Sequence, residues 1–118
     1  MAEVVGSNPS GRLGGQTYAL DLTGEYTAPQ QVTDGPSGGV LVQCVVDSSW
    51  GGTLTFQQSV DGTNWTAALM TNLASAGTAT TAIAAGLFRT DASGGMFRVY
   101  CTQRVFGAMN VTVVPYTG

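Results

Sequence analysis

The sequence predicts an all-β protein, an antiparallel β-sandwich of the jelly-roll or immunoglobulin-like kind with about seven or eight strands. Polar and apolar residues alternate with a period of two in one segment after another from residue 17 onward, which is typical of strands with one buried face. Gly, Pro and Asp-Gly turn signals separate these segments at the spacing expected of short strands. No amphipathic segment long enough for a helix interrupts them.

The chain is expected to form one domain preceded by an arm. At 118 residues it has the usual size of a single domain with a single core. Residues 1–15 are rich in Gly, Ser and Asn and show no hydrophobic period, so we interpret them as an extended N-terminal arm and residues 16–118 as the β-sandwich domain. The arm either frays as a chain terminus or becomes ordered by adding to a neighbouring surface or sheet edge.

Two strands are predicted directly after the arm. In the segment TYALDL, Tyr18, Leu20 and Leu22 share one face. The following segment EYTAPQQ forms a weaker strand that leads into a long turn. Pro29 marks an edge or irregular position there, because proline donates no hydrogen bond to a sheet.

The middle of the chain predicts a central strand followed by a hairpin. The segment VLVQCVV is almost continuously apolar, as expected of a central strand covered on both faces. The segment TLTFQQSV alternates, with Leu54, Phe56 and Val60 on its apolar side. Asp61-Gly62 then predicts a turn, and the chain returns through NWTAAL.

The last third of the chain predicts further strands. Residues 70–88 are rich in Ala and Thr, and Gly77 together with the Thr cluster favours loop and strand over a short helix. The segments GMFRVYCT and AMNVTVVPY are two more alternating strands. They are joined through QRVFG, where Gly107 supplies a turn or a bulge.

The predicted core collects the apolar residues of these strands: Leu20, Leu22, Val42, Cys44, Leu54, Phe56, Trp65, Val99, Cys101, Val111 and Val113. Cys44 and Cys101 each lie in a strand-like apolar run, so we interpret them as buried free thiols that act as small hydrophobes. A disulfide between neighbouring core strands remains an alternative, because the sequence does not place the two Cβ atoms.

The composition argues against an enzyme. The chain has no His, and its four basic residues are all Arg, so the usual general base and the amine that forms Schiff bases are missing. The acids Asp34, Asp47, Asp61 and Asp91 fall in predicted turns, where Asp is favoured for its local hydrogen bonds. Two thiols without His leave zinc short of ligands, and the single acid of DGTN is too few for a calcium loop. We therefore expect no catalytic residue, no cofactor and no metal.

The low charge points to an assembly component. Charged residues make up 9% of the chain, against about 25% in a typical soluble domain. A net charge of −3 without a basic stripe argues against nucleic acid, and the short apolar runs argue against a membrane. No signal peptide is recognisable, so we expect synthesis in a cytoplasm. Strand faces of Thr and Gln cost less to desolvate than charged ones, which favours packing against copies of this chain or a larger scaffold.

The hairpin region resembles small β-sandwich virion proteins of tailed bacteriophages. In that group a W-x-G-T-L-x-F-x-x-S-x-D-G-x-x-W hairpin precedes a strand pair of the type R-V-x-x-T…G-x-x-N-V-T. The matching positions here are Trp50, Gly52, Thr53, Leu54, Phe56, Ser59, Asp61, Gly62 and Trp65, then Arg98, Val99, Thr102, Gly107, Asn110, Val111 and Thr112. The resemblance covers about residues 40–115 and does not extend to the arm.

The resemblance implies a structural role in the phage particle, most like that of a head decoration, or cement, protein. Such a protein would sit on the capsid surface as a homo-oligomer, often a trimer, and clamp adjacent major capsid subunits. In the arm, Val4, Val5, Arg12 and Leu13 are the candidate residues for contact with the capsid or another subunit. Two alternatives stay open: a carbohydrate-binding β-sandwich module, because S-x-D-G-x-x-W also occurs in sugar-binding sandwiches, and a neck or tail ring component.

Overall fold

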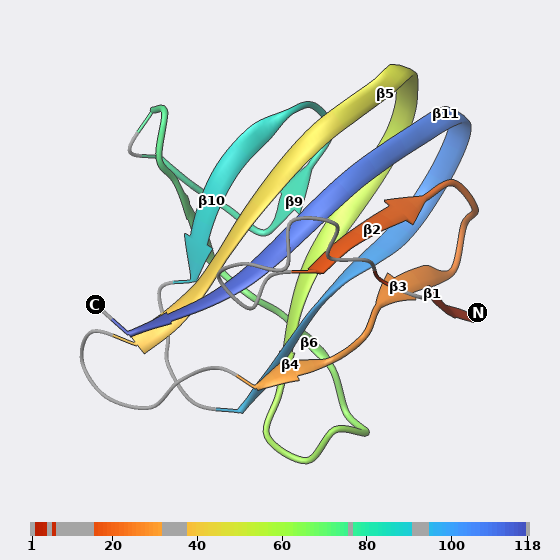
Figure 1. The fold of residues 1–118 in the computed structure, drawn as a ribbon. Helices are drawn as coiled ribbons and strands as arrows, with labels where there is room; N and C mark the ends of the chain where they lie inside the picture. The colour runs from red at the N-terminus through yellow and green to blue at the C-terminus, as the bar shows by residue number, and fades with distance from the viewer. Residues whose placement is uncertain are drawn as a thin grey trace.

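The computed structural model describes residues 2–4, 6, 16–31, 38–75, 77–90 and 95–117. The strands are β1 (Ala2–Val4), β2 (Gln16–Leu20), β3 (Glu25–Thr27), β4 (Gln30–Gln31), β5 (Gly38–Ser59), β6 (Thr66–Ala67), β7 (Met70–Asn72), β8 (Thr78–Ala79), β9 (Thr81–Ala82), β10 (Gly86–Thr90) and β11 (Met96–Thr117) (Figure 1). The predicted all-β class is confirmed, and none of the described residues is helical. Accordingly, this part of the chain contains no helix that could cross a membrane.

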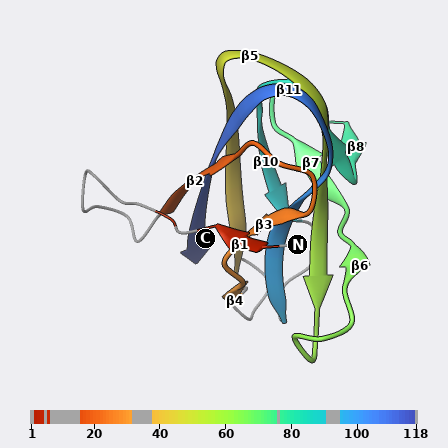
Figure 2. The same cartoon turned by 90° about the vertical axis from the view of Figure 1, so that its right-hand side faces the viewer.

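Two strands of 22 residues each, β5 and β11, form the framework. They pair antiparallel from one end to the other, from Gly38 opposite Thr117 to Ser59 opposite Met96. A straight strand of that length would span roughly 70 Å, whereas the longest dimension of the molecule is 38 Å. The paired strands therefore arch over, and Figure 2 shows the bend at the top of the molecule.

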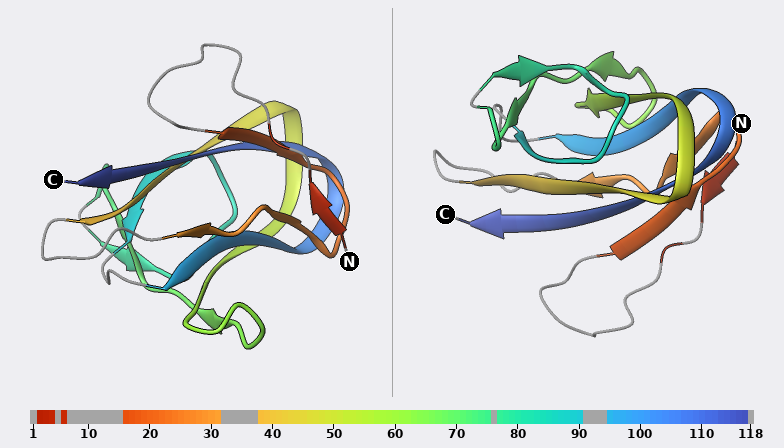
Figure 3. Two further views of the ribbon diagram at one scale, coloured as in Figure 1. Left: turned by 60° about the horizontal axis from the view of Figure 1, so that its bottom comes forward. Right: turned by 90° about the horizontal axis from the view of Figure 1, so that it is seen from above.

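The bend converts one connected sheet into two facing layers (Figure 3). In the first layer, β2 pairs with the second half of β11, and β10 and β7 extend from the first half of β5. In the second layer, β3 and β4 pair with the first half of β11, and β6 and β9 pair with the second half of β5. The pairing is antiparallel as predicted except at one edge, where β1 lies parallel to β3.

The bend is built from irregular pairing. The β5–β11 register shifts between Cys101 and Gln103, between Arg104 and Phe106, and between Gly107 and Ala108. Gly107 has a φ of +78°, a left-handed conformation that glycine adopts without strain. A Cβ placed on Gly107 would lie 1.8 Å from the carbonyl oxygen of Ser49. The predicted role of Gly107 at a bulge is thus confirmed, although the bulge lies inside one long strand and does not separate two strands.

The core lies between the layers and is formed by every second residue of the paired strands. It comprises Tyr18, Leu20, Val40, Val42, Cys44, Leu54, Phe56, Ala68, Met70, Ala82, Phe88, Phe97, Val99, Cys101, Met109, Val111 and Val113. The Phe56 ring is central, with the Phe88 ring centroid 4.9 Å away and that of Phe97 at 6.3 Å. All predicted core residues lie in this cluster except Leu22 and Trp65.

Leu22 was wrongly placed in the core, because its side chain is 58% exposed. Strand β2 ends at Leu20, two residues earlier than the alternation suggests. The Glu25 carboxylate then accepts hydrogen bonds from the backbone N–H groups of Asp21 and Leu22, at 2.9 and 3.0 Å. This turn breaks the two-residue period before it reaches Leu22, so the side chain faces solvent.

Two other strand predictions are wrong in the burial that they assign to apolar side chains. Val60 is 97% exposed and does not continue the buried row of Leu54 and Phe56. The segment VLVQCVV is central in its pairing, between β10 and β11, but only one of its faces is covered. Val42 is buried while Val45 is 46% exposed, because each layer of a two-layer fold keeps a solvent face.

Both cysteines are free thiols buried in the core, as predicted. Cys44 pairs across the sheet with Val111 in the first layer, whereas Cys101 pairs with Leu54 in the second. Burial raises the pKa of Cys44 to about 12 and also raises the pKa of Cys101. At neutral pH both side chains are therefore protonated and act as small apolar groups.

We predict that Gly107→Ala lowers the free energy of unfolding by at least about 2 kcal/mol, because the new Cβ meets the Ser49 carbonyl in a left-handed conformation. Urea unfolding followed by circular dichroism measures the loss. The matched control is Gly77→Ala, at an exposed site where the nearest atom to a new Cβ is the Ser75 Oγ at 3.4 Å. Equal stability of the two variants would contradict the role assigned to Gly107.

Candidate functional site

The outer face of the second layer carries an arginine held between aromatic rings. Phe97 and Val99 of β11 point into the core, so Arg98 and Tyr100 point outward. The Arg98 guanidinium carbon lies 4.3 Å from the ring centroid of Tyr26 and 4.2 Å from that of Trp65. The Tyr100 centroid is 5.3 Å away from the same carbon. Three separate parts of the chain thus meet at one cation.

The orientation of the guanidinium is set by a neighbouring amide. Gln57 stands opposite Arg98 in the β5–β11 pairing, and its Oε1 accepts a hydrogen bond of 2.8 Å from the Arg98 Nε. Burial lowers the pKa of Arg98, while Tyr26 and Tyr100 act in the opposite direction. Because an arginine is effectively always protonated in proteins, the site carries a full positive charge at neutral pH.

The surroundings of this cation are polar but uncharged. The hydroxyls of Thr55 and Thr102 are hydrogen-bonded to each other beside Tyr100. We call the surface formed by Tyr26, Thr55, Gln57, Trp65, Arg98, Tyr100 and Thr102 the Arg98 face. All its members are partly or fully exposed. Trp, Tyr and Arg are the residues most enriched at the energetically dominant positions of protein interfaces, so this face has the composition of a contact surface.

The loop after β5 holds Trp65 over Arg98. Asp61 organises this loop: its Oδ1 accepts the backbone N–H groups of Thr63 and Asn64, both at 2.8 Å, and its Oδ2 accepts the Asn64 Nδ2 at 2.8 Å. The Ser59 hydroxyl donates to the Asp61 Oδ1 at 2.9 Å. These bonds, those from Asn64 first, lower the pKa of Asp61 far below its usual value. The predicted Asp-Gly turn is confirmed as a structural turn.

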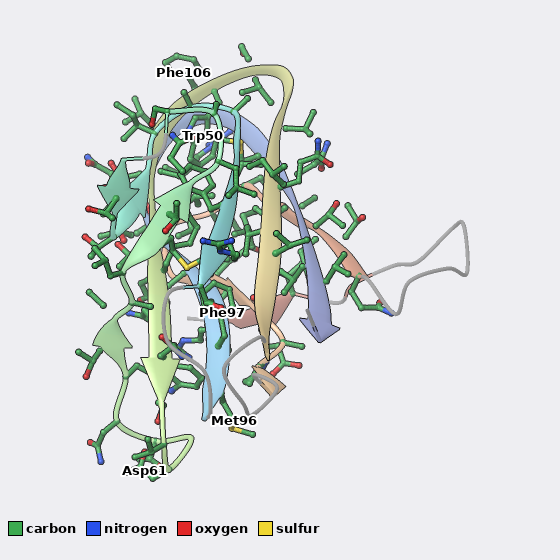
Figure 4. All side chains as sticks on the ribbon, turned by 90° about the vertical axis from the view of Figure 1, so that its left-hand side faces the viewer. Trp50, Asp61, Met96, Phe97 and Phe106 are labelled. Carbon is green, nitrogen blue, oxygen red and sulfur yellow. The ribbon has the colours of Figure 1, made fainter. Side chains whose placement is uncertain are left out.

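A second exposed feature lies at the bend, at the opposite end of the molecule from Asp61 (Figure 4). Val105 and Phe106 are 61% and 51% exposed there. The Phe106 ring covers Gly51, since a Cβ on that glycine would lie 2.5 Å from the ring. Trp50 packs partly against the core, and its buried indole N–H has no partner among the described residues. The bend is thus a small apolar tip beside one charged side chain, that of Arg104, whose Nε donates to the Gly107 carbonyl.

The predicted contact residues of the arm are only partly described. Val4 lies in β1, pairs with Thr27 and packs against the core. Val5, Arg12 and Leu13 lie outside the described residues, so their role as contact residues stays a prediction. No described residue of the arm stacks on the Arg98 guanidinium or is hydrogen-bonded to it. Within the described ranges, no three Cys, Asp or Glu side chains lie close enough together to hold a metal ion.

The sequence contained part of the signal for the Arg98 face. Arg98 and Tyr100 are two residues apart in an alternating strand, which predicts a shared face. Trp65 was assigned to the core, but it is only half-buried and stacks on Arg98. The loop of Asp61 returns the chain across the outer side of the sheet and places the indole there. The contribution of Tyr26 depends on its pairing with Tyr100, a contact that no local pattern reveals.

Comparison with known proteins identifies the fold but no family. No protein-family model and no curated protein matches the sequence. Among solved structures, the chain resembles the SPBc2 prophage-derived protein YomS, with a TM-score of 0.63 over 86% of this chain and 95% of that chain. The sequence identity is 9%, so the likeness shows a shared fold with a protein of prophage origin.

We predict that the Asp61 turn makes stability depend on acid pH. Its hydrogen bonds favour the carboxylate, so the folded-state pKa lies below the unfolded value of about 3.9. The resulting stabilisation is complete above that value and is lost as the pH falls below it. The difference in Tm between the wild type and Asp61→Asn should therefore be largest near neutral pH and shrink below about pH 4. A constant difference in thermal unfolding across this range would contradict the assignment.

Proposed function

We propose that this chain is a structural virion protein of a tailed phage, a decoration or cement protein that binds the outer capsid surface and stabilises adjacent major capsid subunits. The observation that carries the proposal is the Arg98 face, an uncharged polar surface of Thr, Gln, Tyr and Trp around a single arginine. Its binding partner would be the major capsid protein. The protein would be made in the host cytoplasm and function on the assembled particle.

The composition of the Arg98 face suits a permanent contact. Hydroxyl and amide groups lose less hydration energy on burial than ionised groups, and they pair readily with polar backbone of a partner. Tyr26 and Trp65 add large rigid apolar areas at low cost in side-chain entropy. In an isolated chain these rings stay half-exposed to water. Their apolar area then contributes nothing to binding.

The likeness to a prophage-derived protein supports a phage setting. It agrees with the resemblance of the hairpin to small virion proteins. A cement protein opposes the separation of capsid subunits under the pressure of packaged DNA. Binding several subunits at once makes this effective, because linked modest contacts add up to a strong attachment.

The carbohydrate-binding alternative finds less support in the geometry. A sugar platform needs a free, flat aromatic face. One face of the Trp65 ring is covered by the Arg98 guanidinium at 4.2 Å. Trp50 is half-buried at the bend and packs against the core. Trp50 is thus engaged in packing, and Trp65 has one of its two ring faces taken by a cation of the same chain, which leaves less aromatic surface for a sugar than a dedicated platform offers.

We predict that Thr102→Glu weakens binding to capsids about tenfold or more, because it buries an unpaired charge in the proposed contact. Co-sedimentation with capsid shells that lack this protein measures the apparent affinity. Gln43→Glu is the control, since Gln43 is equally an exposed strand residue but lies on the first layer. A variant without residues 1–15 tests the contribution of the arm. Wild-type protein that does not bind shells, or that binds neck or tail structures in their place, would refute the proposal.

We predict that the purified chain is a homotrimer, the form suited to the three-fold positions of a capsid. Sedimentation equilibrium at several concentrations measures the assembled mass. A mass near three times the 12.1 kDa of one chain is expected. A monomer at every concentration would contradict the trimer, and capsid binding would then have to proceed through single copies.

A further inference from the structure

We propose that Arg98 binds a carboxylate of an acidic side chain, Asp or Glu, on the protein partner, and that Tyr26 and Trp65 hold its guanidinium ready for this contact. The inference rests on the proposed function only in taking the partner to be a protein. It adds the chemistry that the partner must present at the centre of the Arg98 face.

The guanidinium has donors left to use. It carries five N–H groups, and the structure assigns the Nε–H to Gln57. No described residue accepts a hydrogen bond from the two terminal nitrogens, which form the end of the planar group. A carboxylate matches that end with two parallel N–H···O bonds, the strongest common pairing of an arginine.

The charge of Arg98 is not neutralised within the described part of the chain. Glu3 lies opposite Tyr26 in the β1–β3 pairing, but it is not among the groups that act on the pKa of Arg98. Two other described acids, Glu25 and Asp61, serve their own turns. The Glu25 carboxylate accepts backbone N–H groups before β3, and the Asp61 carboxylate is engaged inside its loop. Among the described residues no acid acts on the pKa of Arg98: burial lowers it, and two tyrosines act in the opposite direction. A cation is therefore kept partly buried and unpaired in a chain whose net charge is −3.

The rings prepare the site for binding. A guanidinium between two aromatic faces keeps its stacking while its edge bonds a carboxylate, because the two contacts use different directions. Stacking and the Gln57 bond also remove side-chain freedom before the partner arrives, so less entropy is lost on binding. The neutral rim of Thr55 and Thr102 offers no competing charge to the incoming acid.

Protein carboxylates fit the site better than phosphates of nucleic acid. Binding to a phosphate backbone uses several Lys and Arg side chains along a groove, whereas this face contains one arginine and the chain has no Lys. Thr, Gln and Tyr around a single cation match the mixed polar surface of another protein.

The test is an NMR titration of the labelled full chain with a capped Gly-Gly-Glu-Gly-Gly peptide and its Gln counterpart. The Glu peptide is expected to shift the Trp65 indole N–H and Arg98 Nε–H signals with saturation in the millimolar range, and the Gln peptide to leave them in place. Trp50→Phe identifies the Trp65 signal. Arg98→Gln should abolish the shift, and Arg98→Lys, which keeps the charge without the planar fork, should weaken binding at least threefold.

Arg89→Gln is the matched control, because Arg89 is an exposed strand arginine on the first layer, and it should bind like the wild type. Equal shifts with both peptides, or no shift in the folded wild type, would overturn the proposal. Tighter binding of dimethyl phosphate or glucuronate than of the Glu peptide would also overturn it. If Arg98→Gln does not fold, the proposal is still tested by comparing the Glu and Gln peptides on the wild type. The affinity of Arg98→Lys for the Glu peptide gives a second test. Loss of capsid binding with intact peptide binding would refute the proposed function and leave this inference standing.

Discussion

The pairing of β5 with β11 is the constraint on which the rest of the structure depends. These two strands supply core residues to both layers, and six of the nine other strands pair directly with one of them. Because they are far longer than the molecule is wide, they must bend, and the bend brings one face of the sheet against itself. A single antiparallel ladder thus produces a two-layer fold without a separate second sheet. The close backbone approach at Gly107 is the local condition for that bend.

The same alternation that builds the core also builds the Arg98 face. Phe97, Val99 and Cys101 occupy the inner side of β11, so the intervening Arg98 and Tyr100 are forced outward. Core and candidate site are therefore not independent. A register slip of one residue would expose the apolar row and bury the arginine at the same time. Packing of the core consequently stabilises the position of the cation on the outer face.

Three charged residues of the described part of the chain serve as hydrogen-bonding groups in turns or at the bend. Glu25 and Asp61 act as hydrogen-bond acceptors that close turns, and neither faces the Arg98 guanidinium. Arg104 donates from its Nε to the Gly107 carbonyl at the bend, 3.1 Å away. Arg98 differs from these, because stacking and one amide fix its position without neutralising it. Within the described part of the chain its charge therefore has no acidic partner.

The sequence by itself determined the all-β class, most of the core, the Asp61 turn and the bulge at Gly107, because alternation and turn chemistry act over a few neighbouring residues. It did not reveal that segments separated in the pattern join into two long bent strands, nor that Leu22 leaves the core where a turn breaks the period. Only the tertiary structure decided the Arg98 face. Tyr26, Trp65 and Arg98 come from distant parts of the chain, and their meeting depends on strand pairing and bending that no local pattern encodes.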